Sequence, residues 1–415
     1  MTKRFIIIVA LLSTVFSAAQ EGTSSPYSYY GIGLTKFKGT VENQSMGGLQ
    51  LFSDSIHLNL RNPAGYGKLR LTTFAVGGSY TTTKLKNEDA SENASTTSFD
   101  YLAIGIPTGK LNFGLGVLPY SSVGYNISNV ADESFSSFTG RGGMNKVFLS
   151  AGYMVNKNLN LGVDVNYNFG NYQKKSTVFQ RGVTSGTRII NRTDLHGFNF
   201  NFGADYQAKL NESLQLYTAA TYAPEMNITA EKMRNIATIS IRTDGSEVVA
   251  PPVSNLTLPE EDLVIPSQFT IGAGMGETNK WFLGAEMTNI GSGSYNFSEN
   301  VPGLDYFYED ASQYRLGGFY IPEYNSLTGY FNRVVYRAGI RYEETGLNIS
   351  NEGINEFGMS FGLGLPAGNN FSNINLGVEY GQRGTTNSGL LKENFFKFTI
   401  SLSLNDKWFV QSKID

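Results

Sequence analysis

The feature that most constrains the fold of this chain is a strict alternation of apolar and polar residues, repeated in segments of about ten residues. From Leu159 to Gly170 every second residue is apolar, and the residues between are Asn, Gly or Asp. The same alternation recurs at 198–207, 357–365 and 396–404. Because successive side chains of a β-strand point to opposite faces, each segment predicts a strand with one apolar and one polar face.

The length of these segments indicates where the apolar face lies. A tilted strand needs about nine to eleven residues to cross a bilayer, whereas strands of soluble proteins are usually about five to six residues long. In a membrane barrel the apolar face meets lipid, the polar face lines the lumen, and closure leaves no unpaired edge in hydrocarbon. The 47 Gly, 24 Tyr and 28 Phe, with only 16% charged residues, are typical of such a barrel. We therefore expect an all-β, antiparallel transmembrane barrel.

Roughly fourteen strands are expected in a barrel that spans residues 69–406, an even number as in other single-chain bacterial barrels. Their expected spans are 69–86, 97–107, 111–127, 146–155, 159–178, 197–209, 214–241, 266–277, 280–291, 312–322, 333–345, 355–366, 371–384 and 394–405. The long connections fall at 128–145, 179–196, 242–265 and 292–311. Short periplasmic turns and long outer loops produce this pattern, so both ends of the barrel and a C-terminal tail at 407–415 are expected in the periplasm.

The first nineteen residues are typical of a secretion signal. Lys3 and Arg4 precede an apolar run at 5–16, and Ser17-Ala18-Ala19 places small residues before the expected cleavage after Ala19. No later segment has eighteen consecutive apolar residues, which excludes membrane-spanning helices. Secretion together with a barrel predicts the outer membrane of a Gram-negative bacterium. The chain has no Cys, so disulfides and thiolate metal sites are impossible, and its net charge of −3 argues against a nucleic-acid partner.

Residues 20–68 do not share the alternation. We interpret them as an N-terminal plug, or hatch, folded into the lumen. The alternative is a disordered periplasmic tail. The plug is favoured because the segment is too apolar for a solvated tail, with Met46, Leu49, Leu51, Phe52, Ile56, Leu58 and Leu60.

At this point the sequence resembles a known family. Ser45-Met46-Gly47-Gly48, then Asp54, then Asn62-Pro63-Ala64-Gly65, ahead of about fourteen strands, resembles the FadL/TodX family (OMPP1) of outer-membrane transporters for hydrophobic compounds. The hatch of that family ends in an Asn-Pro-Ala motif, here Asn62, Pro63 and Ala64. Leu258-Pro259 and the expected third strand at 113–120 also resemble family features. The resemblance covers essentially the whole mature chain.

The resemblance implies passive transport. A hydrophobic small molecule, such as a fatty-acid-like compound, would be captured by outer loops, pass to a pocket above the hatch, and leave sideways through a kink in the third strand. Such a route keeps the molecule out of water. Gly114, Gly116, Pro119 and Gly124 lie where this lateral-gate kink would be, because Pro donates no ladder hydrogen bond and Gly permits a bend. The alternative, that these residues only tune the curvature of the barrel, stays open.

The same family includes PorV-like barrels, which are partners in a protein secretion system. Nothing in the sequence excludes that role, so an adaptor that binds another protein is the second hypothesis. Membrane lipids and lipopolysaccharide are expected neighbours in either case. The apolar stretch at 248–253 lies in an expected outer loop and fits either a capture groove or packing between loops.

Several charged residues fall on the polar phase of their strands. An Arg on the lipid face near the midplane would cost about 2–4 kcal/mol, so these side chains are expected in the lumen. Their mixed signs favour a network that grips the plug over a polar track for a charged solute. They are Asp164, Asp205, Glu286, Arg337, Arg341, Glu343 and Glu379.

An enzyme is the weakest hypothesis. A Ser-His site for acyl transfer would need one of the two histidines, His57 and His196, beside a serine. Neither lies in a recognisable catalytic motif. We therefore expect no catalytic activity, no cofactor and no bound metal.

Overall fold

The computed structural model describes residues 22–88, 90–291, 306–367 and 372–408. The predicted signal peptide lies outside the described residues, as does the predicted tail beyond residue 408. Within the described ranges, the chain contains no helix with the length and apolar character needed to cross a membrane.

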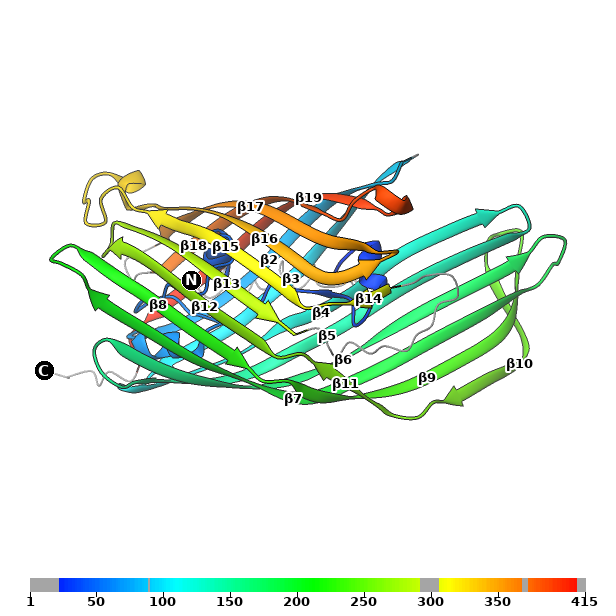
Figure 1. The fold of residues 1–415 in the computed structure, drawn as a ribbon, viewed down its shortest axis with the longest axis horizontal. Helices are drawn as coiled ribbons and strands as arrows, with labels where there is room; N and C mark the ends of the chain where they lie inside the picture. Colours follow the sequence, from blue (N-terminus) through cyan, green and yellow to red (C-terminus); the bar gives the residue numbers. More distant parts are fainter. Residues whose placement is uncertain (1–21, 89, 292–305, 368–371, 409–415) are drawn as a thin grey trace, which may run out of the picture.

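Fourteen antiparallel strands form a closed barrel, as the alternation predicted (Figure 1). Each strand pairs with the next one in the ring, and β19 closes it by pairing with β2, from Lys392 opposite Lys86 to Asp406 opposite Thr72. The ring consists of β2 (Thr72–Lys86), β3 (Ser91–Pro107), β4 (Leu111–Ala131), β5 (Ser134–Met154), β6 (Leu159–Gln180), β7 (Gly186–Lys209), β8 (Leu214–Ala223), β12 (Gln268–Glu277), β13 (Trp281–Ile290), β15 (Ala311–Tyr320), β16 (Val335–Ile349), β17 (Glu352–Ala367), β18 (Ser372–Arg383) and β19 (Lys392–Asp406).

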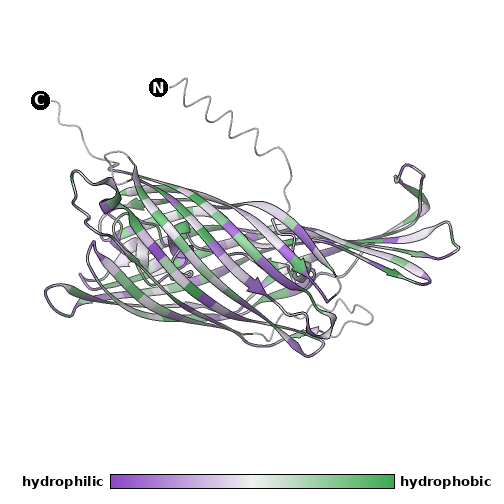
Figure 2. Ribbon diagram, turned by 90° about the horizontal axis from the view of Figure 1, so that it is seen from above, coloured by the Kyte–Doolittle hydropathy of each residue, from purple (hydrophilic) through white to green (hydrophobic). Residues whose placement is uncertain are grey.

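The outer face of the barrel is apolar. In β19, Phe396 and Ile400 are 52% and 49% exposed, while the alternate residues Thr399 and Ser401 are buried. Figure 2 shows the same alternation of hydrophobic and hydrophilic residues along the neighbouring strands. A continuous exposed apolar surface of this kind is suited to the hydrocarbon of a membrane.

The expected long outer loops at 128–145, 179–196 and 242–265 are largely wrong, because most of these residues are in strands. The outer parts of β4 to β7 continue beyond the barrel and are joined by β9 (Met226–Ile241), β10 (Glu247–Thr257) and β11 (Glu261–Ile265) (Figures 1 and 2). We call residues 126–140, 171–196 and 226–257 the extension. In these residues the apolar alternation that marks a strand fades, while the backbone pairing continues.

The expected single strand at 214–241 is also wrong. β8 ends at Ala223, and β9 begins at Met226 and pairs with the outer half of β7, from Gly186 to His196. The other end of β7, from Phe202 to Lys209, pairs with β8, and β8 in turn pairs with β12. Of the fourth expected loop, 292–311, residues 292–305 lie outside the described residues, and the short β14 (Tyr306–Tyr308) pairs with β16.

The N-terminal segment, residues 22–71, lies inside the barrel. It contains η1 (Pro26–Tyr29), β1 (Leu34–Thr35), α2 (Val41–Gln44) and η2 (Pro63–Lys68). Thr40 and Asn43 form a capping box that starts α2, and the Asn62 side chain caps η2, whose first residue is Pro63. Met46, Leu49 and Leu51 belong to one buried apolar cluster and Leu58 and Leu60 to another, and each of the five is at most 5% exposed. Two further turns, η3 (Tyr330–Arg333) and η4 (Asn387–Gly389), connect strands of the barrel.

Candidate functional site

The Asn62-Pro63-Ala64 tripeptide lies against the inner wall of the barrel. Asn62 is fully buried, and its amide donates a hydrogen bond of 3.3 Å to the Ala204 carbonyl on β7. Glycines of the wall allow this contact. A Cβ atom at Gly162 would lie 2.3 Å from the Ala64 backbone nitrogen, and one at Gly203 would lie 2.2 Å from the Asn62 side-chain oxygen. The motif therefore fixes η2 to β6 and β7.

The seven charges predicted for the lumen all lie on the inner side of the strands, and several contact the N-terminal segment. Glu379 accepts a hydrogen bond of 2.8 Å from Gln44, and Glu286 accepts one of 2.9 Å from the Gln50 backbone. Asp205 lies 2.6 Å from Lys68. Asp164 accepts hydrogen bonds from Ser150 and Asn201, Arg337 donates to Asn375, and Arg341 lies 3.7 Å from Glu343.

Sequence reasoning missed several members of this network. Glu356 contacts both Arg341 and Arg383, and Arg383 lies 3.0 Å from Glu393. Arg315 lies 3.1 Å from Glu286. All are on the polar phase of strands, so the alternation could have identified them as inward-facing. Which acid meets which base depends on the register between strands, which the alternation alone does not give.

The barrel wall has a break between β3 and β4. The two strands pair only from Pro107 opposite Asn112 to Leu102 opposite Val117, although β3 begins at Ser91 and β4 continues to Ala131. The pairing of β4 with β5 continues along the whole strand. Beyond Val117, β4 therefore separates from β3 while it remains attached to β5. We call this place the β3–β4 break.

Pro119 stands where the two strands separate. The register of β4 against β5 shifts between Pro119 and Ser121, so Tyr120 is a bulge residue. Gly114 and Gly116 lie below this point, in the paired part, where a Cβ at Gly114 would collide with the Tyr66 ring. Gly124 lies above it and exchanges backbone hydrogen bonds with the Ser28 hydroxyl at 3.0 and 3.1 Å. The four residues predicted to form the lateral-gate kink therefore lie in different surroundings.

The N-terminal segment covers the edge of β4 that β3 leaves. In β1, Leu34 and Thr35 pair with Ser122 and Ser121, and the Lys36 amide donates to the Tyr120 carbonyl at 2.9 Å. At the break itself only about 10 Å³ remains free, between Lys36, Phe37, Asp100, Tyr101 and Pro119 among others. In this conformation the break is closed by residues of the N-terminal segment.

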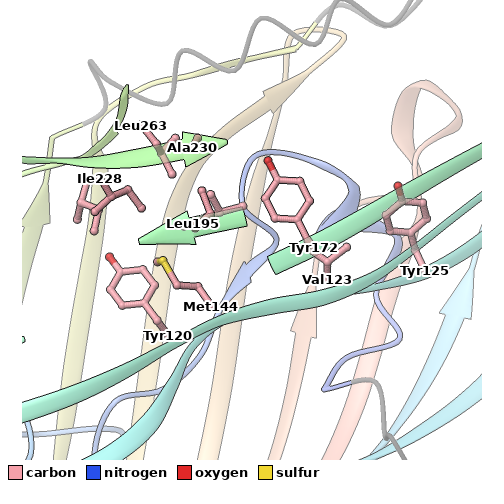
Figure 3. Packing of buried hydrophobic residues seen from close by; sticks show 11 residues of the cluster. Tyr120, Val123, Tyr125, Met144, Tyr172, Leu195, Ile228, Ala230 and Leu263 are labelled. Atoms are coloured by element: carbon pink, nitrogen blue, oxygen red, sulfur yellow. The ribbon is translucent and has the colours of Figure 1, made fainter. Parts of the chain in front are cut away.

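A cavity of about 360 Å³ lies in the lumen, bounded by the N-terminal segment and the inner wall. Charged residues of the network line part of it. Uncharged polar residues and apolar residues line the rest, and of the latter Ile32, Tyr120 and Ile265 also belong to the buried apolar cluster drawn in Figure 3. Because Tyr120 is the bulge residue of β4, the cavity lies directly inside the β3–β4 break.

The two histidines are far from forming a Ser-His pair. His57 lies in the N-terminal segment with its Nδ1 atom 2.6 Å from Asp54 Oδ2, and His196 is an exposed residue of β7. Burial opposes ionisation of Asp54, but His57 and two backbone amides outweigh it and lower the pKa of Asp54 to about 2. The described residues contain no group of three or more potential metal ligands.

Two solved structures superpose on most of this chain. The toluene transporter TodX of Pseudomonas putida superposes with a TM-score of 0.59 at 16% identity, over 89% of this chain and 98% of TodX. A FadL homologue of Pseudomonas aeruginosa gives a TM-score of 0.57 at 14% identity, over 90% and 98% of the two chains. At these identities the likeness establishes a FadL-like barrel fold.

The comparison by sequence gives one further result. The family model described as BamG matches residues 1–415, which is the entire chain. No curated protein sequence matches.

Proposed function

The chain belongs to the BamG family, and we propose that it is an outer-membrane barrel through which hydrophobic compounds cross passively and leave sideways at the β3–β4 break. The observation that carries this proposal is the end of β3–β4 pairing at Leu102 and Val117, beside an internal cavity. Every strand of the ring pairs with both of its neighbours, but β3 and β4 each continue well beyond the last residue pair that joins them. A molecule can pass through the wall most easily where the backbone hydrogen bonds between two neighbouring strands are missing.

Lateral release has a physical advantage for an apolar molecule. A hydrophobe that moved from the lumen into the periplasm would have to enter water, whereas one that moves through the wall stays in an apolar environment. Tyr120 links the lumen cavity with the β3–β4 break, because it lines the cavity and is the bulge residue at the break. TodX, which is described as a toluene transporter, has the same fold, and that likeness supports the proposal.

In this proposal the N-terminal segment is a plug with two tasks. Its core and the Asn62-Pro63-Ala64 motif close the lumen through fixed contacts with the wall, including those of Glu286, Glu379 and Asp205. Residues 28–36 close the β3–β4 break by pairing with β4. Release of a substrate then requires residues 28–36 to move while the core of the plug stays in place.

The break can be tested by removing the bulge. Deletion of Tyr120 together with Pro119→Val should restore regular pairing along β4 and reduce passage of hydrophobic compounds, while the barrel still folds. Pro366→Val is a matched control, because Pro366 lies in β17 opposite Asn373, away from the break. Passage is measured as uptake of radiolabelled toluene and decanoate by cells that produce each variant. Equal uptake by the deletion variant and the control would contradict lateral release.

A second candidate function is that of an adaptor for another protein. The extension favours it, because it lies beyond the barrel and exposes apolar residues to water. Val130 is 78% exposed, Ile241 51%, and Leu256 44%. β10 pairs only with β9, so its other edge is unpaired among the described strands. Exposed apolar surface of this kind often marks a protein contact.

Native mass spectrometry of the protein extracted gently from its own outer membrane separates the two candidates. A small hydrophobic molecule bound in stoichiometric amount is the result expected for the transporter. A stoichiometric protein partner without any small ligand would instead support the adaptor.

A further inference from the structure

The charges that line the lumen cavity are not balanced. Eight cationic side chains and four carboxylates line it among the described residues. All four carboxylates have arginine partners. Glu356 and Glu379 contact Arg341, Glu393 contacts Arg383, and Glu343 lies 3.7 Å from Arg341. On this side of the cavity every carboxylate therefore has a cationic partner, with four carboxylates sharing two arginines.

The side of the cavity next to the β3–β4 break is different. Lys146 of β5 is 7% exposed and lines the cavity, yet the described structure gives its ammonium group no hydrogen bond and no ion pair. It stands opposite Leu118, one residue before Pro119. Its ammonium group lies 6.0 Å from the centre of the Phe148 ring. A side chain this deeply buried loses hydration, so an ammonium group at its end that meets the cavity without a protein partner needs an explanation.

Two further cations lie around the same point. Lys38 of the N-terminal segment places its ammonium group 3.5 Å from the centre of the Tyr120 ring, and no carboxylate of the described ranges forms an ion pair with it. Arg61 donates to the Gly48 carbonyl and lies 3.7 Å from Glu286. The three groups repel one another, Lys38 with Lys146 and Arg61, and Lys146 with Arg61. Two of them come from the plug and one from the wall.

Three carboxylates lie near this cluster, and each is shared with other groups. Glu343, which attracts Lys38 and Arg61, also lies 3.7 Å from Arg341. Asp164, which attracts Lys146, accepts hydrogen bonds from Ser150 and Asn201. Glu286 is closer to Arg315, at 3.1 Å, than to Arg61. Three like charges that point toward a cavity are stabilised when an anion enters it, since charge-assisted hydrogen bonds then replace repulsion.

We propose that Lys38, Arg61 and Lys146 form an anion site in the lumen that binds a carboxylate or phosphate group. The site rests on the proposed function only in so far as its ligand reaches the cavity that a transported compound would use. Ile32, Tyr120 and Ile265 line the same cavity, so the anion can be the acidic end of an amphipathic molecule as well as a free ion. A volume of about 360 Å³ is at the lower end of small-ligand pockets, which fits one single-chain molecule.

The site also connects the ligand with the break. Lys38 is two residues from Lys36, whose amide bonds to the bulge residue Tyr120, and Lys38 itself lies over the Tyr120 ring. An anion that draws Lys38 toward Lys146 would pull on the part of the N-terminal segment that closes the break. In this proposal, binding of the anion is therefore coupled to the release of residues 28–36 from β4.

The test is isothermal titration calorimetry of the full mature protein in a neutral detergent. The probes are decanoate, decanol and inorganic phosphate. We expect decanoate to bind at least tenfold more tightly than decanol, and Lys146→Met and Lys38→Met each to weaken decanoate binding about ten- to hundredfold. Lys146→Arg should restore most of the affinity. Lys157→Met, which removes an exposed charge from the turn between β5 and β6, is the matched control and should change nothing. A heat-modifiable gel shift checks folding of every variant.

The outcomes separate the possible sources of the anion. Phosphate that binds and competes with decanoate supports a site for any small anion. Phosphate that fails to bind while decanoate still exceeds decanol supports a site for the head group of an amphiphile. Equal binding of decanoate and decanol, or loss of binding in Lys157→Met as large as in Lys146→Met, would overturn the anion site. Tight binding of decanol alone would overturn it as well and yet leave the transport of hydrophobic compounds standing.

Discussion

His57 and Asp54 lie in the N-terminal segment near the start of β2, where the Thr73 hydroxyl contacts the neighbouring Ile56 carbonyl. Burial alone would lower the pKa of His57, but the charge and hydrogen bond of Asp54 raise it above the ordinary value of 6.5. Because the folded pKa of His57 is raised and that of Asp54 is lowered, the pair stabilises the segment fully between the ordinary pKa values of the two groups, 3.8 for Asp54 and 6.5 for His57. This contribution is lost as the pH rises through the folded pKa of His57.

The shift can be measured directly, since the chain has only two histidines. We expect an NMR titration of ¹³C-histidine-labelled protein to give one pKa above 6.5, which disappears in His57→Gln. In Asp54→Asn burial remains and the attraction is lost, so the pKa of His57 should fall below 6.5. A titration of His57 that is the same in wild type and Asp54→Asn would refute the ion pair.

The close contact between the N-terminal segment and the barrel wall at Gly162 can also be tested by mutation. Gly162→Ala places a Cβ 2.3 Å from the Ala64 backbone nitrogen, and backbone cannot move aside as a side chain can. We expect a loss of about 1–3 kcal/mol in the free energy of unfolding, measured in urea. Gly353→Ala is the matched control, because its nearest neighbour is a side-chain oxygen at 3.5 Å. Equal stability of the two variants would argue against tight contact.

The sequence predicted which face of its strand a charged residue occupies, but not which partner that residue contacts. The polar phase placed Asp164, Glu286 and Glu379 on the inner side of the wall, because lipid excludes charge from the other side. It could not pair Glu286 with Arg315, since that needs the register of β13 against β15. Nor could it pair Lys68 with Asp205, which lie far apart in the sequence.

At the scale of strands, the environment of an exposed apolar side chain differs between the barrel and the extension. Ile400 in β19 and Val183, between β6 and β7, are 49% and 52% exposed. Ile400→Arg should cost about 2–4 kcal/mol if this face meets hydrocarbon, and should block assembly. Val183→Arg should assemble normally, because Val183 faces water. Assembly is read from the heat-modifiable gel shift, and equal assembly of both variants would contradict a membrane band on β19.

The alternation predicted strands only where lipid imposes it. It gave the short turns and the fourteen strands of the barrel, but it missed the outer parts of β5 and β7, where Ser134–Gly140 and Gly186–His196 are paired and largely polar. The break was predictable in part. Pro119 marked an irregular place in β4, but the loss of pairing with β3 is a relation between two strands that neither sequence contains alone.

For the molecule as a whole, the N-terminal segment decides whether the lumen is closed. Deletion of residues 22–38 removes one wall of the cavity and the cover of the β3–β4 break. We expect this variant to show a single-channel conductance in planar bilayers well above that of the wild type. Deletion of 243–245, in the turn between β9 and β10, is a control that leaves the lumen unchanged. Equal conductance of all three proteins would mean that residues 22–38 do not close the lumen.

The closure of the ring by β19 and β2 sets an order of events during biogenesis. The N-terminal segment is synthesised first, yet Gln44 contacts Glu379 on β18, Glu42 contacts Asn375, and Ser25 contacts Glu393 on β19. These partners are among the last residues to leave the ribosome. Residues 22–71 therefore have no complete binding site until the final strand has been made. A chain cut short before β18 would carry a plug with nowhere to dock, which exposes its apolar core to proteases.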